Sequence, residues 1–385
     1  MEKPRKLLFL IATLYQGGGE RVVSELSLNF PSEVETTILL YERKVSYPFK
    51  GRLLDLGVPL SLNFFLRGFY FLVRFFKFKE VLKKEQPDYV VSFGNSGNMM
   101  NILANPKAIV RIDLPIGESN KGFWGFLYKV FAKFFLRRAK MVMCVSKFAA
   151  EEAVERFGVP RGKVRVVYNP VDINKIQRLS QEPLQAPLEE IFEHPVVITM
   201  GRITKQKGQQ YLFRAFKSIK ESIPDAKLVI LGSGELQNDL SRLAKDLRIE
   251  HDVHFLGWQK NPFSFLARSR VFVLSSLWEG LPDVLLEAMA CGLPVISSDC
   301  RSGPREILAP ATDSNKTAED MEIAEYGILV PVAQEELLSK AMMLVLTDTN
   351  FAYELGKKAK KRAEDFRVDK IIKQWNFLFG DIDRI

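Results

Sequence analysis

Short apolar runs that end in glycine or a small polar residue recur along this chain, and helical patterns separate them. Runs that are apolar throughout are typical of parallel strands buried on both faces, and their alternation with helices predicts an α/β fold. The expected strands are Lys6–Thr13, Thr36–Tyr41, Tyr89–Phe93, Ala108–Ile112, Met141–Val145, Val164–Tyr168, Val196–Met200, Lys227–Leu231, Val253–Leu256 and Val271–Ser275. Open sheets of this kind bind ligands at the carboxyl ends of their strands, so the residues after each run are candidates for a site.

The length of 385 residues is too great for one hydrophobic core and indicates two domains. We expect the first domain over residues 1–172, a linker over 173–193 that is rich in Pro, Gln and Glu, and the second domain over 194–365. Three widely spaced cysteines match neither a disulfide framework nor a metal site, and they indicate a reducing compartment. No apolar stretch is long enough to predict a membrane-spanning helix.

Most of the positive charge lies in two short segments that are rich in aromatic residues. The chain has a formal charge of +9, while residues 61–84 contain six Lys or Arg and one Glu, and residues 121–140 contain six Lys or Arg and no acid. The basic residues expected near single helical faces are Arg67, Arg74 and Lys77 in the first segment, and Lys129, Lys133 and Arg137 in the second. Such helices are predicted to lie on an anionic membrane surface. Core helices with snorkelling basic residues are the alternative. Charge this local does not indicate nucleic-acid binding.

Two loops of the second half contain charged residues suited to a nucleotide diphosphate. The loop Gly201–Gly208 contains Arg202 and Lys207, which can bind phosphates as a fork and as a point charge. Glu279 and Glu287 stand eight residues apart around the start of a helix, where backbone N–H groups favour anions. An amphipathic helix with two solvated glutamates is the alternative. In the first half, the glycines at 17–19 form a further possible phosphate loop.

The spacing of Glu279 and Glu287 resembles the Glu-x7-Glu signature of the family-4 retaining glycosyltransferases. The loop Gly201–Gly208, the run Asn169–Asp172 and the stretch Ser302–Leu308 extend the match in family order. The resemblance implies a GT-B fold, in which two Rossmann-like α/β domains face a central cleft. It also implies that the first domain binds the acceptor, that the second binds a nucleotide sugar, and that a terminal helix over 366–385 returns to the first domain.

The resemblance assigns roles to individual residues. Arg202 and Lys207 would neutralise the leaving diphosphate, Glu279 would contact the donor hexose, and Glu287 would hold the ribose. The other donor-binding residues that it implies are Gly17, Gly18, Gly19, Gly232, Leu256, Trp258, Gly280 and Leu281. Two cations at the leaving group make a divalent metal unnecessary, so we expect no metal and no cofactor beside the UDP-sugar donor. The resemblance also implies retention at the anomeric carbon.

The chain departs from the family pattern in its first domain. Many members have a histidine after the strand that here ends near Arg111, but the three histidines of this chain are His194, His251 and His254. Arg111 and Asp113 occupy that region and are the catalytic candidates of the first domain. Some relatives with lipid-diphosphate acceptors also have an arginine there. An ordinary salt-bridged Arg111 is the alternative.

The acceptor expected from the basic aromatic segments is a membrane-embedded, polyprenyl-diphosphate-linked saccharide, extended with a hexose or N-acetylhexosamine. This places the protein on the cytoplasmic face of the plasma membrane, as a peripheral protein bound through 61–84 and 121–140. The alternatives are a soluble acceptor, a different lipid acceptor such as a lipopolysaccharide core or a glycolipid, an epimerase acting on the UDP-sugar alone, and a nucleotide sensor without catalysis.

Overall fold

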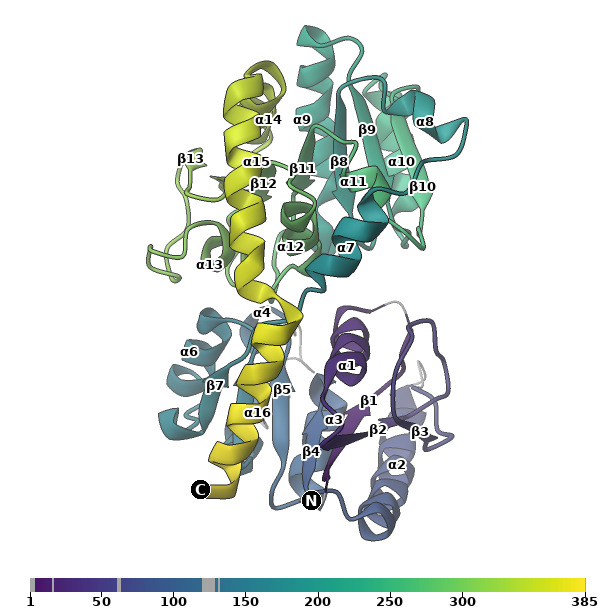
Figure 1. The fold of residues 1–385 in the computed structure, drawn as a ribbon, viewed down its shortest axis with the longest axis vertical. Coiled ribbons are helices and arrows are strands. Elements are labelled where there is room, and N and C mark those ends of the chain that lie inside the picture. The colour runs from purple at the N-terminus through teal and green to yellow at the C-terminus, as the bar shows by residue number, and fades with distance from the viewer. Residues whose placement is uncertain (1–3, 16, 61–63, 120–128, 131, 385) are drawn as a thin grey trace. The chain divides into compact units, whose positions relative to one another are not determined.

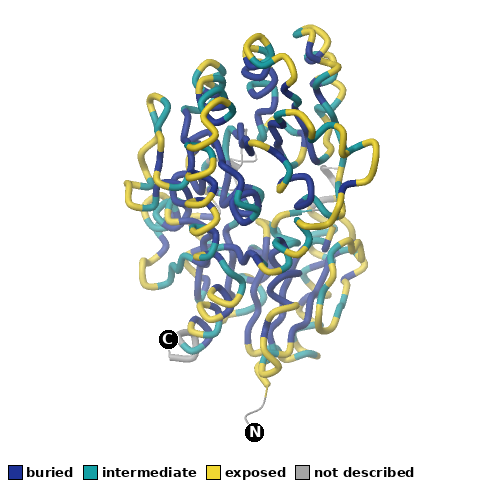
Figure 2. Tube along the Cα trace, turned by 45° about the horizontal axis from the view of Figure 1, so that its top comes forward, coloured by how far each residue is buried: buried dark blue, intermediate teal, exposed yellow. Residues whose placement is uncertain are grey.

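The computed structural model describes residues 4–15, 17–60, 64–119, 129–130 and 132–384, and it divides the chain into two compact units. Unit 1 consists of Met1–Pro170 and Val368–Ile385, and unit 2 consists of Val171–Arg367. Each unit contains a twisted sheet with helices on its faces (Figure 1). Strands and the helix sides turned toward them are buried, while most connecting loops are exposed (Figure 2).

Unit 1 is built on a parallel sheet in the order β3-β2-β1-β4-β5-β6-β7. Its strands are β1 (Arg5–Ile11), β2 (Val34–Leu40), β3 (Arg52–Asp55), β4 (Tyr89–Ser92), β5 (Ile109–Ile112), β6 (Met141–Cys144) and β7 (Val164–Val166). Its helices are α1 (Gly18–Asn29), α2 (Phe64–Glu85), α3 (Gly94–Ala104), α4 (Ile116–Ser119), α6 (Lys147–Glu155) and α16 (Val368–Arg384).

The two faces of the unit 1 sheet carry different helices, because successive strand residues point to opposite sides. Phe9 of β1 packs in one cluster with residues of α1 and with Trp375 of α16. Leu10, the next residue, packs in another cluster with Phe78 of α2 and Met100 of α3. The terminal helix is therefore a part of the unit 1 core, although 197 residues of unit 2 precede it in the chain.

Unit 2 is built on a second sheet in the order β10-β9-β8-β11-β12-β14-β13, parallel except for the pair β13–β14. Its strands are β8 (Val196–Met200), β9 (Lys227–Leu231), β10 (Val253–Gly257), β11 (Val271–Leu274), β12 (Val295–Ser298), β13 (Glu322–Ile323) and β14 (Ile328–Val330). Its helices are α7 (Ile173–Ser180), α8 (Leu188–Ile191), α9 (Gln209–Ser222), α10 (Gln237–Asp246), α11 (Phe263–Leu266), α12 (Asp283–Ala290), α13 (Pro304–Leu308), α14 (Glu335–Thr347) and α15 (Thr349–Ala363).

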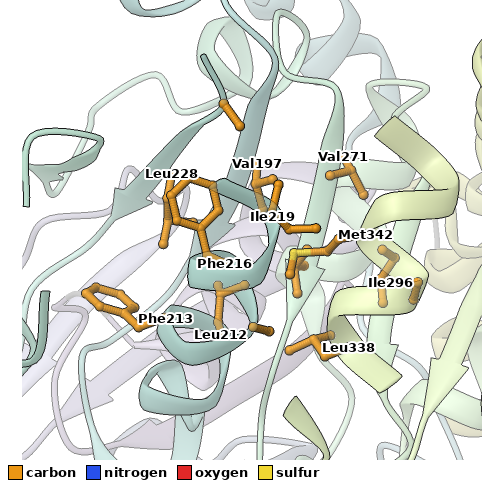
Figure 3. Close-up of a cluster of buried hydrophobic side chains, with 14 of the residues drawn as sticks. Val197, Leu212, Phe213, Phe216, Ile219, Leu228, Val271, Ile296, Leu338 and Met342 are labelled. Carbon is orange, nitrogen blue, oxygen red and sulfur yellow. The ribbon is translucent and has the colours of Figure 1, made fainter. Parts of the chain in front are cut away.

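One hydrophobic cluster of unit 2 lies between the sheet and the helices α9 and α14. Phe216 of α9 and Met342 of α14 are fully buried against strand residues such as Val197 and Ile296 (Figure 3). Helix α9 presents an apolar side at the spacing of one helical face, which explains why it covers the sheet. The prediction of an α/β fold with two parallel sheets is confirmed.

The structure differs from expectation in the segment 173–193, which we expected to be a linker. It contains α7 and α8 and belongs to unit 2. Ile173 and Ile176 of α7 are buried, and Asp172 caps the helix by accepting a hydrogen bond from the Lys175 N–H at 3.0 Å. The Pro and Gln residues of the segment suggested a linker, but the two buried isoleucines tie it to unit 2. Among the described residues, no helix is long and apolar enough to cross a membrane.

Candidate active site

The charged loops of unit 2 follow the two strands at which the strand order reverses. From β8 the chain proceeds outward to β9 and β10, and then returns to β11 on the other side of β8. The loops that follow β8 and β11 therefore lie next to each other at the carboxyl edge of the sheet, the usual ligand site of such folds. Lys207 is on the first of these loops and Glu279 is on the second.

Lys207 and Glu279 form a close ion pair at this edge. The Lys207 Nζ lies 2.6 Å from the Glu279 Oε1, and the two side chains are 15% and 6% exposed. The Ser276 hydroxyl donates to the same carboxylate oxygen at 2.6 Å and is fully buried. Glu279 is thus held by two donors, and the Lys207 ammonium has a fixed position beside it.

Hydrogen bonds to backbone carbonyls hold the two loops together around this pair. The Ser275 hydroxyl donates to the Lys207 carbonyl at 2.9 Å, the Leu277 N–H donates to the Gln206 carbonyl at 2.7 Å, and the Gln206 amide donates to the Trp278 carbonyl at 2.9 Å. Gly208 has φ +59, and a Cβ there would lie 2.3 Å from the Ser275 carbonyl oxygen. Only glycine fits this close approach without strain.

A third loop, after β12, supports the glycine that follows Glu279. The buried Ser302 hydroxyl donates to the Gly280 carbonyl at 2.7 Å, and a Cβ on Gly303 would lie 2.6 Å from the same oxygen. Arg305 anchors this loop through Asp299, at 2.5 Å between Nη2 and Oδ2, and through Glu322. Burial raises the pKa of Asp299, and Arg305 acts against that shift. The sequence analysis gave no role to Ser276 or Asp299, because their contacts to Glu279 and Arg305, three and six residues along the chain, depend on how each loop turns.

The other predicted donor-binding residues of unit 2 occupy several environments. Glu287 lies in α12 and is 2% exposed, whereas Arg202 is exposed and its carbonyl accepts a hydrogen bond from Gln209 at 3.0 Å. Trp258 is half exposed, after β10. Gly232 has φ +128 and packs on the Gly201 backbone. Leu256 is half-buried, and Gly280 and Leu281 are buried beside Glu279. The structure therefore brings Lys207 into contact with Glu279, while Arg202 faces solvent.

In unit 1 the structure places Arg111 inside the protein and Asp113 at its edge. Arg111 is 1% exposed, and its Nε donates to the Asp113 Oδ1 at 2.9 Å. Its Nη2 donates to the Asn169 side chain. The Asp113 side chain is 29% exposed, and a Cβ built on Gly19 would lie 3.6 Å from its Oδ2. Arg111 therefore holds Asp113 in place beside the glycine segment.

The glycine segment itself opens helix α1. Gly17 is the N-cap residue, Gly18 and Gly19 lie in the first turn, and Glu20 follows in the same turn. A Cβ on Gly17 would collide with the Glu20 carboxylate, which covers this glycine. The Glu20 carboxylate thus lies against the glycine segment that was predicted to bind phosphate.

Family models match nearly the whole chain. Residues 16–175 match the model described as Glycosyltransferase Family 4, and residues 181–362 match the model described as Glycosyl transferases group 1. An uncharacterized glycosyltransferase of Methanocaldococcus jannaschii is 34% identical over 346 residues, which are 83% of this chain and 85% of that relative. The chain belongs to the family-4 glycosyltransferases. The predicted family is therefore confirmed.

A second relative of this family-4 glycosyltransferase comes from Campylobacter jejuni and is 28% identical over 378 residues, 95% of this chain and 97% of its own. Its name is N-acetylgalactosamine-N,N'-diacetylbacillosaminyl-diphospho-undecaprenol 4-alpha-N-acetylgalactosaminyltransferase. Among solved structures, HepE of Anabaena in complex with UDP and glucose has a TM-score of 0.77 and 18% identity, over 98% of this chain and 100% of that one. The structural likeness identifies the fold as GT-B.

Among the residues that the structure describes, no group of three or more His, Cys, Asp or Glu side chains is placed to hold a metal ion. The charged groups at the unit 2 edge of this glycosyltransferase include the Lys207 ammonium and the Glu279 carboxylate, and the exposed Arg202 lies on the same loop as Lys207. Such a set can bind phosphate oxygens through its cations and sugar hydroxyls through its carboxylate.

Proposed function

We propose that this chain transfers a hexose or N-acetylhexosamine, with retention, from a UDP-sugar to a polyprenyl-diphosphate-linked saccharide in glycan assembly. The observation that carries the proposal is the Lys207–Glu279 pair at the carboxyl edge of the unit 2 sheet. The name of the Campylobacter relative supports the acceptor class, and the UDP complex of HepE supports the donor class.

In this proposal unit 2 stabilises the leaving group without a metal ion. As the bond from the anomeric carbon to the diphosphate oxygen breaks, negative charge grows on the diphosphate. Lys207, already oriented by Glu279, and Arg202, on the neighbouring surface, would neutralise that charge. Glu279 would accept hydrogen bonds from the sugar, and Glu287 from the ribose. The leaving phosphate would itself take the acceptor proton. The acceptor hydroxyl would enter on the same face of the sugar as the one from which the diphosphate leaves.

In unit 1 the group that would contact the substrate is Asp113. Arg111 is buried behind it, so within this proposal Arg111 orients the Asp113 carboxylate and does not touch the acceptor. This refines the expectation that either residue could take a catalytic part, because an enclosed guanidinium cannot reach a bound sugar.

The membrane part of the proposal rests on an apolar row along α2. Leu66, Phe69, Leu72 and Phe76 are each 42–62% exposed, at spacings of three, three and four residues that keep them near one face. We propose that this row inserts into the lipid surface. Exposed Lys79 and Lys83 follow it toward the end of the helix and would meet anionic headgroups.

A second exposed patch lies on the same side of the unit 1 sheet. Val130 and Phe134 are more than half exposed, and Lys133 and Arg137 beside them are exposed as well. Ala132 and Leu136 of this segment pack with Val110 of β5. The strand register places Val110 in one row with Leu10, the face that α2 covers. Both patches thus point away from the same sheet face.

Some predicted membrane contacts are absent from these surfaces. Arg74 is buried, and the Lys129 ammonium donates to the Gly117 carbonyl at 2.9 Å. Phe71 and Phe75 pack partly against the core. The side chain of Arg67 and residues 61–63, 120–128 and 131 lie outside the described part. The proposed location remains the cytoplasmic face of the plasma membrane, as a peripheral protein.

The decisive experiment is product analysis with candidate substrates. Detergent extracts are incubated with a panel of UDP-sugars and polyprenyl-diphosphate-linked saccharides, and the lipids are analysed by mass spectrometry. We expect one added sugar mass or a ladder of them, abolished by Lys207→Ala and insensitive to EDTA. Transfer to soluble or lipopolysaccharide acceptors alone, or epimerised donor without released UDP, would point to an alternative function. Loss of activity with EDTA and its return with added metal would contradict the metal-free scheme.

A further inference from the structure

Arg305 of α13 is a buried arginine that binds two carboxylates. It is 6% exposed, and its Nε and Nη2 both donate to the Asp299 Oδ2, at 3.0 and 2.5 Å. Its Nη1 and Nη2 donate to the two carboxylate oxygens of Glu322 at 3.2 and 2.7 Å. Desolvation offsets most of the attraction within a buried ion pair. The main effect of these contacts is therefore to fix the end of β12, the start of α13 and β13 relative to one another.

Between Asp299 and Arg305 the chain makes a turn in a conformation that side chains disfavour. Ser302 has φ +73 and Gly303 has φ +89. A serine is strained at a positive φ, so the surrounding contacts have to hold the turn. Two arginines anchor it, because Arg305 binds back to Asp299 and Arg362 of α15 donates to two carbonyls of α13 at 2.9 and 3.1 Å. The conformation of the turn therefore depends on side chains that lie outside it.

This turn packs against the backbone that follows Glu279. The Ser302 hydroxyl donates to the Gly280 carbonyl at 2.7 Å. A Cβ added to Gly303 would lie 2.6 Å from the same oxygen and 3.1 Å from the Leu281 Cα, so the two segments are in close contact. Gly280 and Leu281 are buried and connect Glu279 to the start of α12. A shift of the turn would therefore move the backbone beside the Glu279 carboxylate.

We propose that Arg305 is a positioning residue for the donor sugar. It holds the turn that fixes the backbone next to Glu279, the carboxylate to which the proposed function assigns the hexose, and the proposal rests on that function. Exact placement of such a group matters most in the transition state, whereas ground-state binding tolerates small shifts. Arg305 should therefore influence the cleavage of a UDP-sugar more than the binding of UDP.

Cleavage of the donor by the full chain, measured as UDP release in the presence of acceptor, tests this role. We expect Arg305→Met to lower kcat at least about tenfold and to leave the Kd of UDP within about twofold, because a misplacement of about 1 Å can cost roughly a hundredfold in rate. Arg214→Met, which removes an arginine–carboxylate pair from an exposed position of the same unit, should behave as the wild type does. An unchanged kcat in folded Arg305→Met would overturn the proposal, as would a Kd of UDP that rises as much as kcat falls.

A double variant separates positioning from stability. Arg305→Met leaves Asp299 buried without its cation, so its Tm should fall. Arg305→Met with Asp299→Asn removes the uncompensated charge and should regain much of the Tm, while kcat stays low because the turn is still not anchored. A kcat that recovers together with the Tm would make Arg305 structural and overturn the proposal. If Arg305→Met alone does not fold, the double variant takes its place in the kinetic comparison.

A second pair of variants tests whether Arg305 acts through the turn. Ser302→Ala removes the hydroxyl that binds the Gly280 carbonyl and should also lower kcat. Because both changes would release the same contact, Ser302→Ala with Arg305→Met should be at most about twofold slower than the slower single variant. Losses in kcat that multiply would show that Arg305 acts by another route and would overturn the proposal.

Failure of the proposed function gives a different result. UDP release reports cleavage of the donor whatever accepts the sugar. Transfer to an acceptor other than a polyprenyl-diphosphate-linked saccharide would thus contradict that function and leave the comparison of variants valid. If the wild type binds a UDP-hexose but cleaves none, calorimetry decides. Arg305→Met should then weaken binding of the UDP-hexose more than binding of UDP, and an equal change in both would overturn the proposal.

Discussion

Glu279 is the residue on which the geometry of the proposed donor site depends. Its Oε1 receives both the Lys207 ammonium and the Ser276 hydroxyl, each at 2.6 Å. The Ser276 carbonyl in turn accepts a hydrogen bond from Ser298 at 2.5 Å, which ties the loop to β12. The carboxylate is thus oriented before any substrate arrives, which is how fixed charges contribute most to a transition state.

Ser276→Ala should therefore lower kcat while it leaves UDP affinity nearly unchanged. Loss of this hydrogen bond lets Glu279 and Lys207 reorient, and we expect an effect of about 1–2 kcal/mol on the barrier, roughly five- to thirtyfold. Steady-state kinetics give the number. Ser276→Thr, which keeps the hydroxyl, should recover most of the rate, and Ser233→Ala, at an exposed position, is the matched control. An unchanged kcat in Ser276→Ala would remove Ser276 from the site.

Glu287→Ala should weaken UDP binding. A ribose hydroxyl would lose a charged acceptor, worth about 1.5–3 kcal/mol, or roughly ten- to hundredfold in Kd. Calorimetry with UDP measures it, and circular dichroism checks the fold, because Glu287 is 2% exposed within α12. Normal affinity in a folded variant would rule out the ribose role.

At the scale of elements, α2 has one side that packs on the sheet and another side that is exposed. Phe78 and, in part, Phe75 pack on the sheet, whereas Phe69 and Phe76 face outward. A helix in a globular protein normally exposes polar residues on its outer side. An outward apolar row of this kind is what the proposed contact with lipid requires.

Phe69→Ser with Phe76→Ser should reduce sedimentation with both neutral and anionic vesicles. Each ring that inserts contributes about 1.5–3 kcal/mol of apolar burial, which salt does not screen. Lys133→Gln with Arg137→Gln should weaken binding to anionic vesicles only, by about 1 kcal/mol for each charge. Phe377→Ser, which alters an exposed ring of α16, is the control. If the double phenylalanine variant sediments like the wild type, the row does not contact lipid.

At the scale of the whole molecule, α16 packs in the same unit 1 core as β1 and α1. Trp375 and Phe379 of α16 are fully buried and stack edge-on or tilted against Phe9 and Phe30. The rings that join the two chain ends come from positions more than 340 residues apart. Unit 1 thus depends on a segment that all of unit 2 separates from the rest of unit 1 in the chain.

Trp375→Ala should destabilise unit 1 by about 3–5 kcal/mol, the usual cost of an aromatic cavity. Denaturant unfolding followed by a probe in each unit measures it, and we expect the UDP affinity of unit 2 to persist. Phe377→Ala, two residues away but 68% exposed, should change little. Equal stability of the two variants would mean that α16 is not a part of the unit 1 core.

Local pattern was enough to predict most strands, the α/β class and the loops that carry Lys207 and Glu279, whereas β3, β13 and β14 were not expected. Apolar runs such as Val271–Ser275 have few ways to bury their side chains other than as strands of a parallel sheet. The charged residues that follow them then lie at one edge, because parallel strands end there together. The Glu-x7-Glu spacing and the glycine of Gly208 are equally local features.

Tertiary structure decided what spacing cannot encode. Periodicity placed Arg74 on a basic face with Lys77, yet packing against Tyr41, which directly follows β2, buries it. Arg111 is an interior residue that supports Asp113, and its Nη2 donates to Asn169, which lies 58 residues further along the chain. The turn of the loop after β11 directs the Ser276 hydroxyl to the Glu279 carboxylate. Each of these outcomes depends on how the folded backbone turns side chains toward one another, which the order of residues within one segment does not determine.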